Sequence, residues 1–333
     1  MRTVTLKDVA AAAGVSVSTV SRVLDERLPP SRSQAAERVR VAAAELGYRR
    51  DAAASALRRG DTATIGVLVP RLRDTVMALL FEALYTEAAH RGLFALVSVC
   101  GDDPAEESNA TESLLSRRVD GLVLAAARLD DALPTRLRNQ HVPHVLALRT
   151  DGHSPAAVCD DELGGYLATR HLIDLGHERV AVLPGPDFTS TAARRLAGFR
   201  QAVSEAGLKA PGGVVRHCGF DYQAGLQTAG ALLGEQPDVT AVFAANDQLA
   251  LGAITAAHQL GRRVPEDLSV VGYNDTPLAA QLPVPLTTVR VPFERIAADA
   301  LDLLSSTPPA PQGAAVERRS TPTLIPRHST ARP

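Results

Sequence analysis

Hydrophobic and polar positions follow two different patterns along this chain. Between residues 5 and 48, apolar side chains recur every three or four positions in three short segments, which predicts three helices. From residue 64 onward, short apolar runs alternate with longer amphipathic segments, which predicts strands alternating with helices. Such alternation is typical of parallel sheets covered by helices, so we expect a small all-α part followed by a larger α/β part.

The first two predicted helices are short and meet at Gly14. Thr5 and Ser16 can cap their starts, and glycine adopts the positive φ that often ends a helix. The second helix has an apolar stripe on one side and presents on the other side Val17, Ser18, Ser21 and Arg22. A pair of helices with small polar and arginine side chains facing outward suits the DNA major groove, whereas the alternative is a helical hairpin with a solvated face.

A third helix is predicted to complete this small unit. Ser31 can cap it, Gln34 stands at the capping-box position, and Gly47 ends it. Three short helices around one core are typical of a DNA-binding headpiece.

The second part predicts two similar lobes. Its candidate strands lie at residues 65–69, 94–99, 121–125, 144–148, 180–183, 214–217, 241–244 and 268–272. The helical segments lie at 75–91, 163–175, 191–206, 222–233 and 248–260. Because two series open at residues 65 and 180, a ligand is expected between two lobes, at the carboxyl ends of the strands. Beyond Ser305 we expect a loop and a last strand near residues 323–325.

The charge of the chain is unevenly distributed. The net charge of the 333 residues is −2, but residues 1–60 hold eleven Lys or Arg against six Asp or Glu. The remainder holds 24 basic and 31 acidic residues. A basic end on an acidic body indicates a nucleic-acid-binding head on a sensor domain.

Composition narrows the expected location and class of protein. With 45% hydrophobic and 22% charged residues, the chain resembles an ordinary globular protein of two or three domains. The first twenty residues lack the apolar core of a signal peptide, and no run is long enough to span a membrane. Cys100, Cys159 and Cys218 lack a metal-ligand spacing, so we expect free thiols, no metal and a cytoplasmic location.

Several motifs resemble those of one bacterial family. The segments 6–10 (LKDVA), 14–24 (GVSVSTVSRVL) and 45–48 (ELGY) resemble the headpiece of LacI/GalR repressors. The resemblance continues through 65–70, 119–121, 172–177, 195–199, 243–247, 264–273 and 285–290, which resemble the effector-binding core of that family. That core is similar to a periplasmic sugar-binding protein.

The resemblance implies a fold and a division of the chain. It implies an all-α helix-turn-helix headpiece at residues 1–48, a hinge helix or linker at 49–61, and a two-lobed α/β core at 62–333. The core is of the type I periplasmic-binding-protein kind, has parallel sheets, and both binds the effector and dimerises. A homodimer would bind a near-palindromic double-stranded DNA operator with recognition helices in successive major grooves.

The resemblance also implies which residues contact DNA. They are Thr5, Lys7, Ser16, Val17, Ser18, Thr19, Ser21, Arg22, Arg32, Arg49 and Leu57. Arg22 is expected to read a guanine edge with Val17 and Ser18 tuning selectivity, whereas Lys7, Arg32 and Arg49 would contact phosphates. Leu57 matches a leucine that wedges between base steps in the minor groove. The usual Pro-Asn before this helix is Arg50-Asp51 here, and an Ala-rich flexible linker is the alternative.

Effector-binding residues are implied in the same way. The candidates are Arg71, Arg73, Asp160, Thr191, Arg195, Phe220, Asn246 and Asn274. Asn274 stands where the family usually has a ligand-binding aspartate. Arg71 and Arg73 stand where family members commonly have Asp-x-x-Asn-Pro and an aromatic pair, and two arginines there would favour an acidic ligand. The alternatives are an exposed Arg195, a helix-capping Asn246 or Asp160, a core Phe220, and solvated arginines.

These features together predict a ligand-responsive regulator, most consistent with repression of a carbohydrate uptake or catabolism operon. A sugar or sugar derivative would be the effector, with no cofactor and no membrane partner. A solute-binding protein for transport would need export and has no use for a basic head. An enzyme is not expected, because the chain has no GxSxG, P-loop, HExxH or Gly-rich dinucleotide motif.

Overall fold

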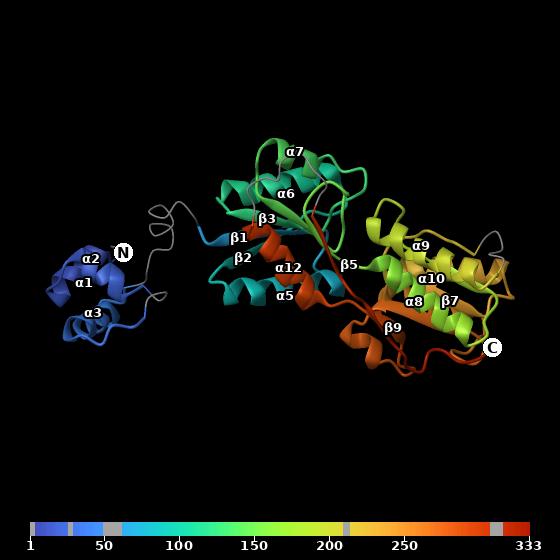
Figure 1. Cartoon of the computed structure of the whole chain (residues 1–333). Coiled ribbons are helices and arrows are strands. Elements are labelled where there is room, and N and C mark those ends of the chain that lie inside the picture. Colours follow the sequence, from blue (N-terminus) through green and yellow to red (C-terminus); the bar gives the residue numbers. More distant parts are fainter. Residues whose placement is uncertain (1–3, 26–28, 49–61, 209–213, 307–315) are drawn as a thin grey trace. The chain divides into compact units, whose positions relative to one another are not determined.

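The computed structural model describes residues 4–25, 29–48, 62–208, 214–306 and 316–333. The chain divides into two compact units, residues 1–62 and 63–333, which are described separately (Figure 1). Arg49 and Leu57 lie outside the described residues, as do Arg50 and Asp51.

The first unit is the three-helix unit that the sequence predicted. It contains α1 (Leu6–Ala13), α2 (Val17–Val23) and α3 (Gln34–Glu45). One small core joins the three helices through the buried side chains of Val9, Ala10, Ala13, Val20, Val39, Ala42 and Ala43. These positions recur at helical spacing, so the hydrophobic stripe of each helix faces the other two.

The helix ends follow the predicted capping, with one correction. Asp8 accepts hydrogen bonds from both the backbone N–H and the hydroxyl of Thr5, and Gly14 has the left-handed φ of 64° that ends α1. Ser16 caps α2 by accepting from the N–H of Thr19 at 3.2 Å. The prediction that Ser31 caps α3 was wrong. Because α3 begins at Gln34, the residue before it, Ser33, is the cap and accepts from the N–H of Ala36.

The second unit contains two sheets, one in each lobe. The first sheet has the order β10-β5-β4-β3-β1-β2 and is wholly parallel. Its strands are β1 (Thr64–Val69), β2 (Phe94–Val99), β3 (Gly121–Leu124), β4 (His144–Ala147), β5 (Ala156–Cys159) and β10 (Glu317–Ser320). The second sheet, of order β11-β9-β8-β7-β6, is parallel except where β11 pairs antiparallel with β9. Its strands are β6 (Val180–Leu183), β7 (Ala241–Ala244), β8 (Ser269–Asn274), β9 (Thr287–Arg290) and β11 (Thr323–Ile325).

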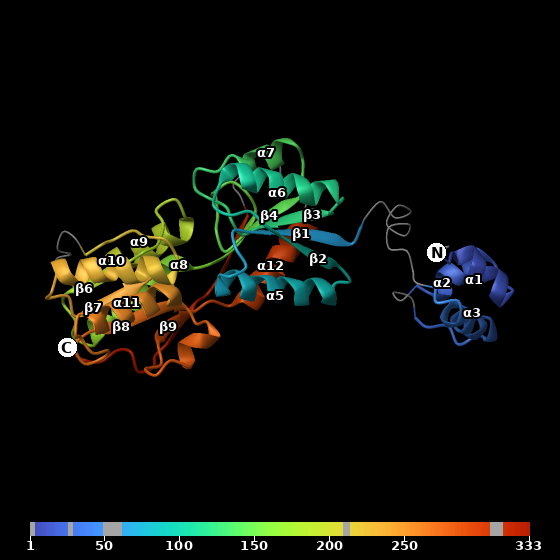
Figure 2. The ribbon, with the colours of Figure 1, turned by 180° about the vertical axis from the view of Figure 1, so that it is seen from behind.

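Helices cover both faces of each sheet (Figure 2). In the first lobe, α5 (Thr75–His90) and α12 (Phe293–Ser305) cover one face, and α6 (Pro104–Ser116) and α7 (Leu133–Asn139) cover the other. In the second lobe, α8 (Asp161–Asp174) and α9 (Ser190–Glu205) lie opposite α10 (Tyr222–Glu235) and α11 (Asp247–Gln259). Consecutive residues of a strand therefore face different cores, which explains why the central strands are apolar throughout.

Two kinds of strand differ from the prediction. Residues 214–217 form no named strand, and only Val215 makes a bridge, to Val182. Conversely, the short strands β9 and β10 were not predicted as strands. The sequence of β10 is ERRS, which has no apolar signal because this strand lies at the edge of its sheet.

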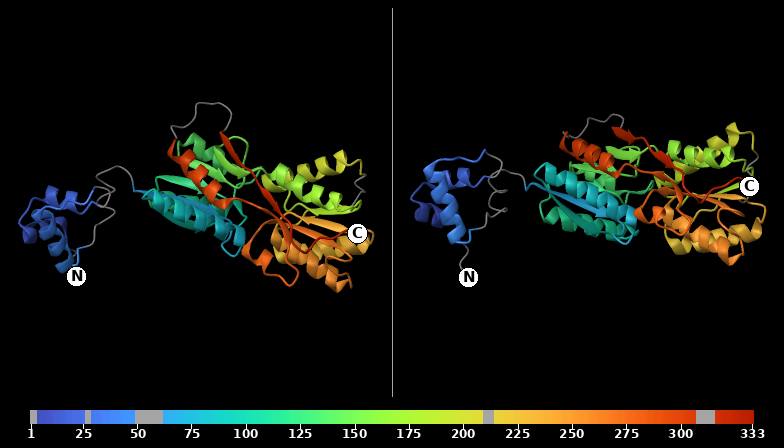
Figure 3. Two further views of the ribbon diagram at one scale, coloured as in Figure 1. Left: turned by 60° about the horizontal axis from the view of Figure 1, so that its bottom comes forward. Right: turned by 90° about the horizontal axis from the view of Figure 1, so that it is seen from below.

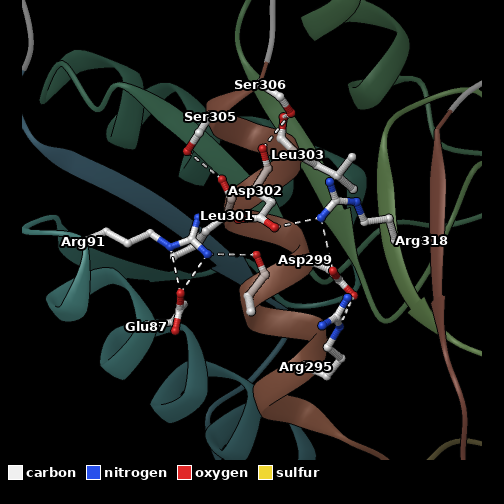
Figure 4. Close-up of polar contacts among 11 residues, drawn as sticks. Glu87, Arg91, Arg295, Asp299, Leu301, Asp302, Leu303, Ser305, Ser306 and Arg318 are labelled. Atoms are coloured by element: carbon white, nitrogen blue, oxygen red, sulfur yellow. Dashed lines mark hydrogen bonds and ion pairs between the residues drawn. The ribbon is translucent and has the colours of Figure 1, made fainter.

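The chain passes between the two lobes three times within the described residues. It crosses from β5 to α8, from β9 to α12, and from β10 to β11, so the C-terminal segment belongs to both sheets (Figure 3). Ion pairs fix α12 to the first lobe (Figure 4). Arg91 beside α5 pairs with Glu87 and Asp302, and Arg318 of β10 pairs with Asp299 and Asp302. No helix among these residues is both long and apolar enough to cross a bilayer.

Candidate functional site

Helix α2 presents the side chains expected to contact DNA. Val20 is fully buried against the other two helices, and the opposite side of α2 leaves Val17, Ser18 and Arg22 exposed. The hydroxyl of Ser16 lies 2.8 Å from that of Thr19, so both side chains also support the start of the helix. Ser21 is half-buried, and Thr5, Lys7 and Arg32 are exposed. The exposed face therefore presents Val17 and Ser18 at the start of the helix and Arg22 in its last turn.

The second unit contains two adjoining cavities between its lobes. The inner one has a volume of about 40 Å³, and five of the predicted effector residues line it: Thr191, Arg195, Phe220, Asn246 and Asn274. The outer one has a volume of about 670 Å³ and is lined by Arg71, Arg73 and Phe220, among others. Asp74 and Arg149 line both cavities. The structure thus brings together seven of the eight predicted effector residues.

Asp160 is the exception. Its carboxylate accepts a hydrogen bond from the N–H of Leu163 at 3.1 Å and caps α8, and it lines neither cavity. The capping alternative therefore accounts for this residue.

Arg195 is buried and already has protein partners. Its side chain is 7% exposed, its Nε donates to Asp161 at 2.8 Å, and its Nη1 donates to the carbonyl of Ala245. The guanidinium also stacks over the ring of Tyr273 at 3.7 Å. Because these contacts hold the guanidinium in one orientation, the exposed-arginine alternative is wrong, and only the remaining edge is available to a ligand.

Asn246 performs the capping role and also lines the inner cavity. Its Oδ1 caps α11 by accepting from the N–H of Leu249 at 2.7 Å, and its Nδ2 donates to the carbonyl of Phe220 at 2.8 Å. This second bond fixes the loop that carries Phe220, so Asn246 shapes the cavity even where it does not contact ligand.

Asn274 lies at a sharp turn at the end of β8. It has φ of 102° and the next residue, Asp275, has φ of 54°, both of which are costly for residues other than glycine. Asp275 is fixed by Arg290 at 2.7 Å and by Arg327 at 2.6 Å. The residue after Asp275 is Thr276, and both its backbone N–H and its hydroxyl donate hydrogen bonds to the carboxylate of Asp247. These bonds keep Asn274 pointing into the inner cavity in a conformation that the chain alone would not favour.

Arg149 is the most important residue that the sequence analysis missed. It follows β4, is 7% exposed, and donates from Nη1 to the carbonyls of Ala126 and Ala127. No motif identified it. The available signal was its position just after the strand run 144–148, since the carboxyl ends of parallel strands border the ligand cleft.

The lobes touch beside the outer cavity through Arg128 and Phe188. The guanidinium of Arg128 lies 3.9 Å from the ring centre of Phe188, and the N–H of Leu129 donates to the carbonyl of Phe188 at 2.9 Å. Arg128 and Phe188 line a small cavity together with Glu107. The buried oxygens Glu107 Oε1 and Asp131 Oδ2 have no hydrogen-bond donor among the described residues. A proton shared by the two carboxyl groups would supply the missing hydrogen bond.

This carboxyl pair leads to a prediction about pH. Burial and the neighbouring Asp131 raise the pKa of Glu107 from 4.5 to about 8, against the opposing effect of Arg149 and Arg128. Because the folded state holds this proton more tightly than the unfolded state, the free energy of unfolding should fall as pH rises between these two values. In Glu107→Gln, an amide donor replaces the proton and this fall should be reduced.

Urea denaturation at pH 5, 7 and 9 would measure the effect. Glu106→Gln serves as the control, because Glu106 is an exposed neighbour on the same helix. A Glu107→Gln profile as steep as that of the parent protein would show that no proton is shared.

Comparisons with known proteins agree with both units. Residues 5–51 match the family described as bacterial regulatory proteins, lacI family, and residues 169–330 match the periplasmic binding protein-like domain. The ribose operon repressor of Escherichia coli (strain K12) is 34% identical over 305 residues, covering 90% of this chain and 92% of the relative. The regulator GalR of the same strain is 35% identical over 335 residues, covering 99% of this chain and 96% of that protein.

Solved structures are similar over nearly the whole chain. A lac repressor dimer bound to operator and the anti-inducer ONPF has a TM-score of 0.86 and 31% identity, and the match covers 99% of this chain and 100% of that one. A complex of the regulator CelR with cellobiose has a TM-score of 0.74 and 30% identity, covering 98% and 99% of the two chains.

Proposed function

Because this chain belongs to the LacI family of bacterial transcriptional regulators, we propose that it represses a carbohydrate uptake or catabolism operon in the cytoplasm. In this proposal, a homodimer binds a near-palindromic operator, and a small molecule between the lobes of each core controls that binding. The proposal includes no catalytic step, in keeping with relatives that are named as repressors and regulators.

The observation that carries the proposal is the exposed face of α2. The helix is anchored by Val20 on one side and presents Val17, Ser18 and Arg22 on the other. An arginine guanidinium can donate two hydrogen bonds to the O6 and N7 atoms of guanine, which no other base pair offers in the same arrangement. We therefore assign Arg22 to base reading and Lys7, Arg32 and Arg49 to phosphate contacts. The remaining candidates would contact the DNA backbone beside the same groove or support the start of α2. They are Thr5, Ser16, Thr19 and Ser21.

An operator-binding experiment tests this assignment. Sites are selected from a random inverted-repeat library with the full-length protein, and affinities are measured by fluorescence anisotropy across a range of salt concentrations. Arg22→Ala should weaken binding to the selected site by about 1–3 kcal/mol, or roughly 5- to 150-fold, and relax the preference at one base pair.

Arg118→Ala serves as the control for this experiment, because Arg118 belongs to the second unit and lies outside the headpiece. Arg38 in the headpiece would be less suitable, because its Nε donates to the carbonyl of Ala13 at the end of α1 and its loss could disturb the fold. Equal affinities of Arg22→Ala and the parent for selected and scrambled sites would contradict the assignment.

The domain boundaries enter the proposal as 1–48 for the headpiece, 49–61 for the hinge and 62–333 for the core. A hinge segment of this length is marginal as an isolated helix, so it would fold only with DNA and a second chain present. Leu57 would then insert between base steps and bend the operator. Ligand binding can change this equilibrium only through its different affinities for the two lobe arrangements. The lobe contact of Arg128 with Phe188 is one that such a rearrangement would alter.

A further inference from the structure

Arg149 is a buried cation without a carboxylate partner. Its side chain is more than nine-tenths buried, and the only hydrogen bonds it makes with described residues are those of Nη1 to the carbonyls of Ala126, at 3.0 Å, and Ala127, at 3.5 Å. No described carboxylate lies within ion-pair distance of it. Since Arg149 lines both cavities, the rest of its guanidinium is available to whatever enters between the lobes.

The other cavity arginines that are buried or half-buried differ in this respect. Arg195 pairs with Asp161, Arg71 with Asp102, and Arg128 with Asp130. Arg73 is also without a carboxylate partner, but it is exposed and solvated at the mouth of the outer cavity. Arg149 is therefore the one that has lost water without gaining an opposite charge.

Such burial is energetically unfavourable for the empty protein. Removing a charged group from water is costly unless a partner of opposite sign replaces the water. Burial accordingly lowers the pKa of Arg149 to about 10, although Asp102 and Asp74 act in the opposite direction. Glu107 also faces Arg149, but burial and the neighbouring Asp131 raise the pKa of its carboxyl group to about 8.

We propose that the effector is a polyhydroxylated anion whose carboxylate or phosphate pairs with Arg149. This inference rests on the proposed function, because it names the class of ligand held between the lobes. A planar guanidinium can bind either group with two parallel hydrogen bonds. Asn274, Asn246 and the free oxygen of Asp74 would receive the ligand hydroxyls, since amides and carboxylates suit them. Phe220 would cover one apolar face.

The position of Asp74 is compatible with this arrangement. Its Oδ1 accepts from the N–H of Val76 at 3.0 Å and caps α5, so the carboxylate is fixed. Burial raises the pKa of Asp74, whereas the N–H of Val76 and the nearby Arg149 and Arg71 act in the opposite direction. A hydroxyl donor beside Asp74 and an anion beside Arg149 therefore satisfy both groups within one ligand.

A thermal-shift experiment on the full-length protein tests the proposal. Three matched sets of probes are used: gluconate and glucuronate, glucose 6-phosphate and ribose 5-phosphate, and the neutral sugars glucose and ribose. An anion at a hundred times its Kd should raise the Tm of the core by about 5 °C. The first two sets distinguish a carboxylate from a phosphate. Stabilisation by neutral sugars alone, or by none of the probes, would overturn the proposal.

Substitutions of Arg149 test whether the anion binds at this side chain. Arg149→Met removes the charge at similar length and should weaken the active anion about 10- to 100-fold, whereas Arg149→Lys should retain part of the affinity. Arg216→Met is the control, because Arg216 pairs with Glu235 away from both cavities. Isothermal titration on each variant separates affinity from fold stability, so a destabilised Arg149→Met remains informative. Equal anion affinity in Arg149→Met and the parent would also overturn the proposal.

Operator binding without ligand is measured in parallel. Specific DNA binding together with a response only to neutral sugars would reject the anionic effector and leave the proposed repressor function intact. Absence of specific DNA binding would reject the function itself, whatever the ligand.

Discussion

Replacing Arg195 by alanine should lower the free energy of unfolding of the core by about 3–5 kcal/mol, because it leaves the carboxylate of Asp161 buried without its partner. The side chains of Arg195 and Asp161 are 7% and 2% exposed, so water cannot replace the lost ion pair. The variant also loses the stacking contact with Tyr273 and the hydrogen bond to the carbonyl of Ala245. Urea denaturation monitored by circular dichroism measures the change.

The double variant Arg195→Met/Asp161→Leu separates the cost of an unpaired charge from the loss of packing. Removing both charges and keeping the volume is often neutral, so the double variant should be clearly more stable than Arg195→Ala. If Arg195→Ala unfolded like the parent but no longer responded to ligand, the guanidinium would serve binding alone. A loss of ligand response should be interpreted only after stability has been measured.

The architecture could be predicted from the sequence because the central strands of each lobe face two cores. Such strands are continuous apolar runs, and several predicted bounds match the structure, as at 94–99, 180–183 and 241–244. The prediction failed where this signal was weak or misleading. Strand β10 is polar because it lies at an edge. In residues 214–217, two valines precede Arg216 and His217, and only Val215 makes a bridge to the sheet.

The candidate site could be predicted only in part. Arg195, Asn246 and Asn274 were found because they belong to segments that resemble the family. Their partners could not be found, since Asp161 is 34 positions from Arg195 and becomes its neighbour only when α8 packs on α9. Arg149 was missed for the same reason, because an arginine after a strand is usually solvated and only the fold shows that this one is buried. Which charged side chains line this cavity, and which of them are paired, therefore depends on tertiary packing and not on the local sequence pattern.

Two helices that position Arg195 pack backbone to backbone, and this contact depends on glycines. A β-carbon at Gly198 of α9 would overlap the carbonyl oxygen of Glu162 in α8, and one at Gly165 of α8 would overlap the carbonyl oxygen of Arg195. Backbone atoms cannot turn away as a flexible side chain can, so the helices would have to separate. The close approach places Asp161 against Arg195 and Thr191 at the wall of the inner cavity.

Gly198→Ala should therefore lower the free energy of unfolding by about 3 kcal/mol, even though alanine is the better helix former. Gly230→Ala in α10 is the matched control, because a β-carbon there meets only the β-carbon of Ala256 at 3.9 Å. This control should be unchanged or more stable by about 0.5–1 kcal/mol, since alanine restricts the unfolded chain. Equal stability of the two variants would mean that the α8–α9 contact can open at little cost. Arg195 would then be held by its ion pair rather than by the helices that carry it.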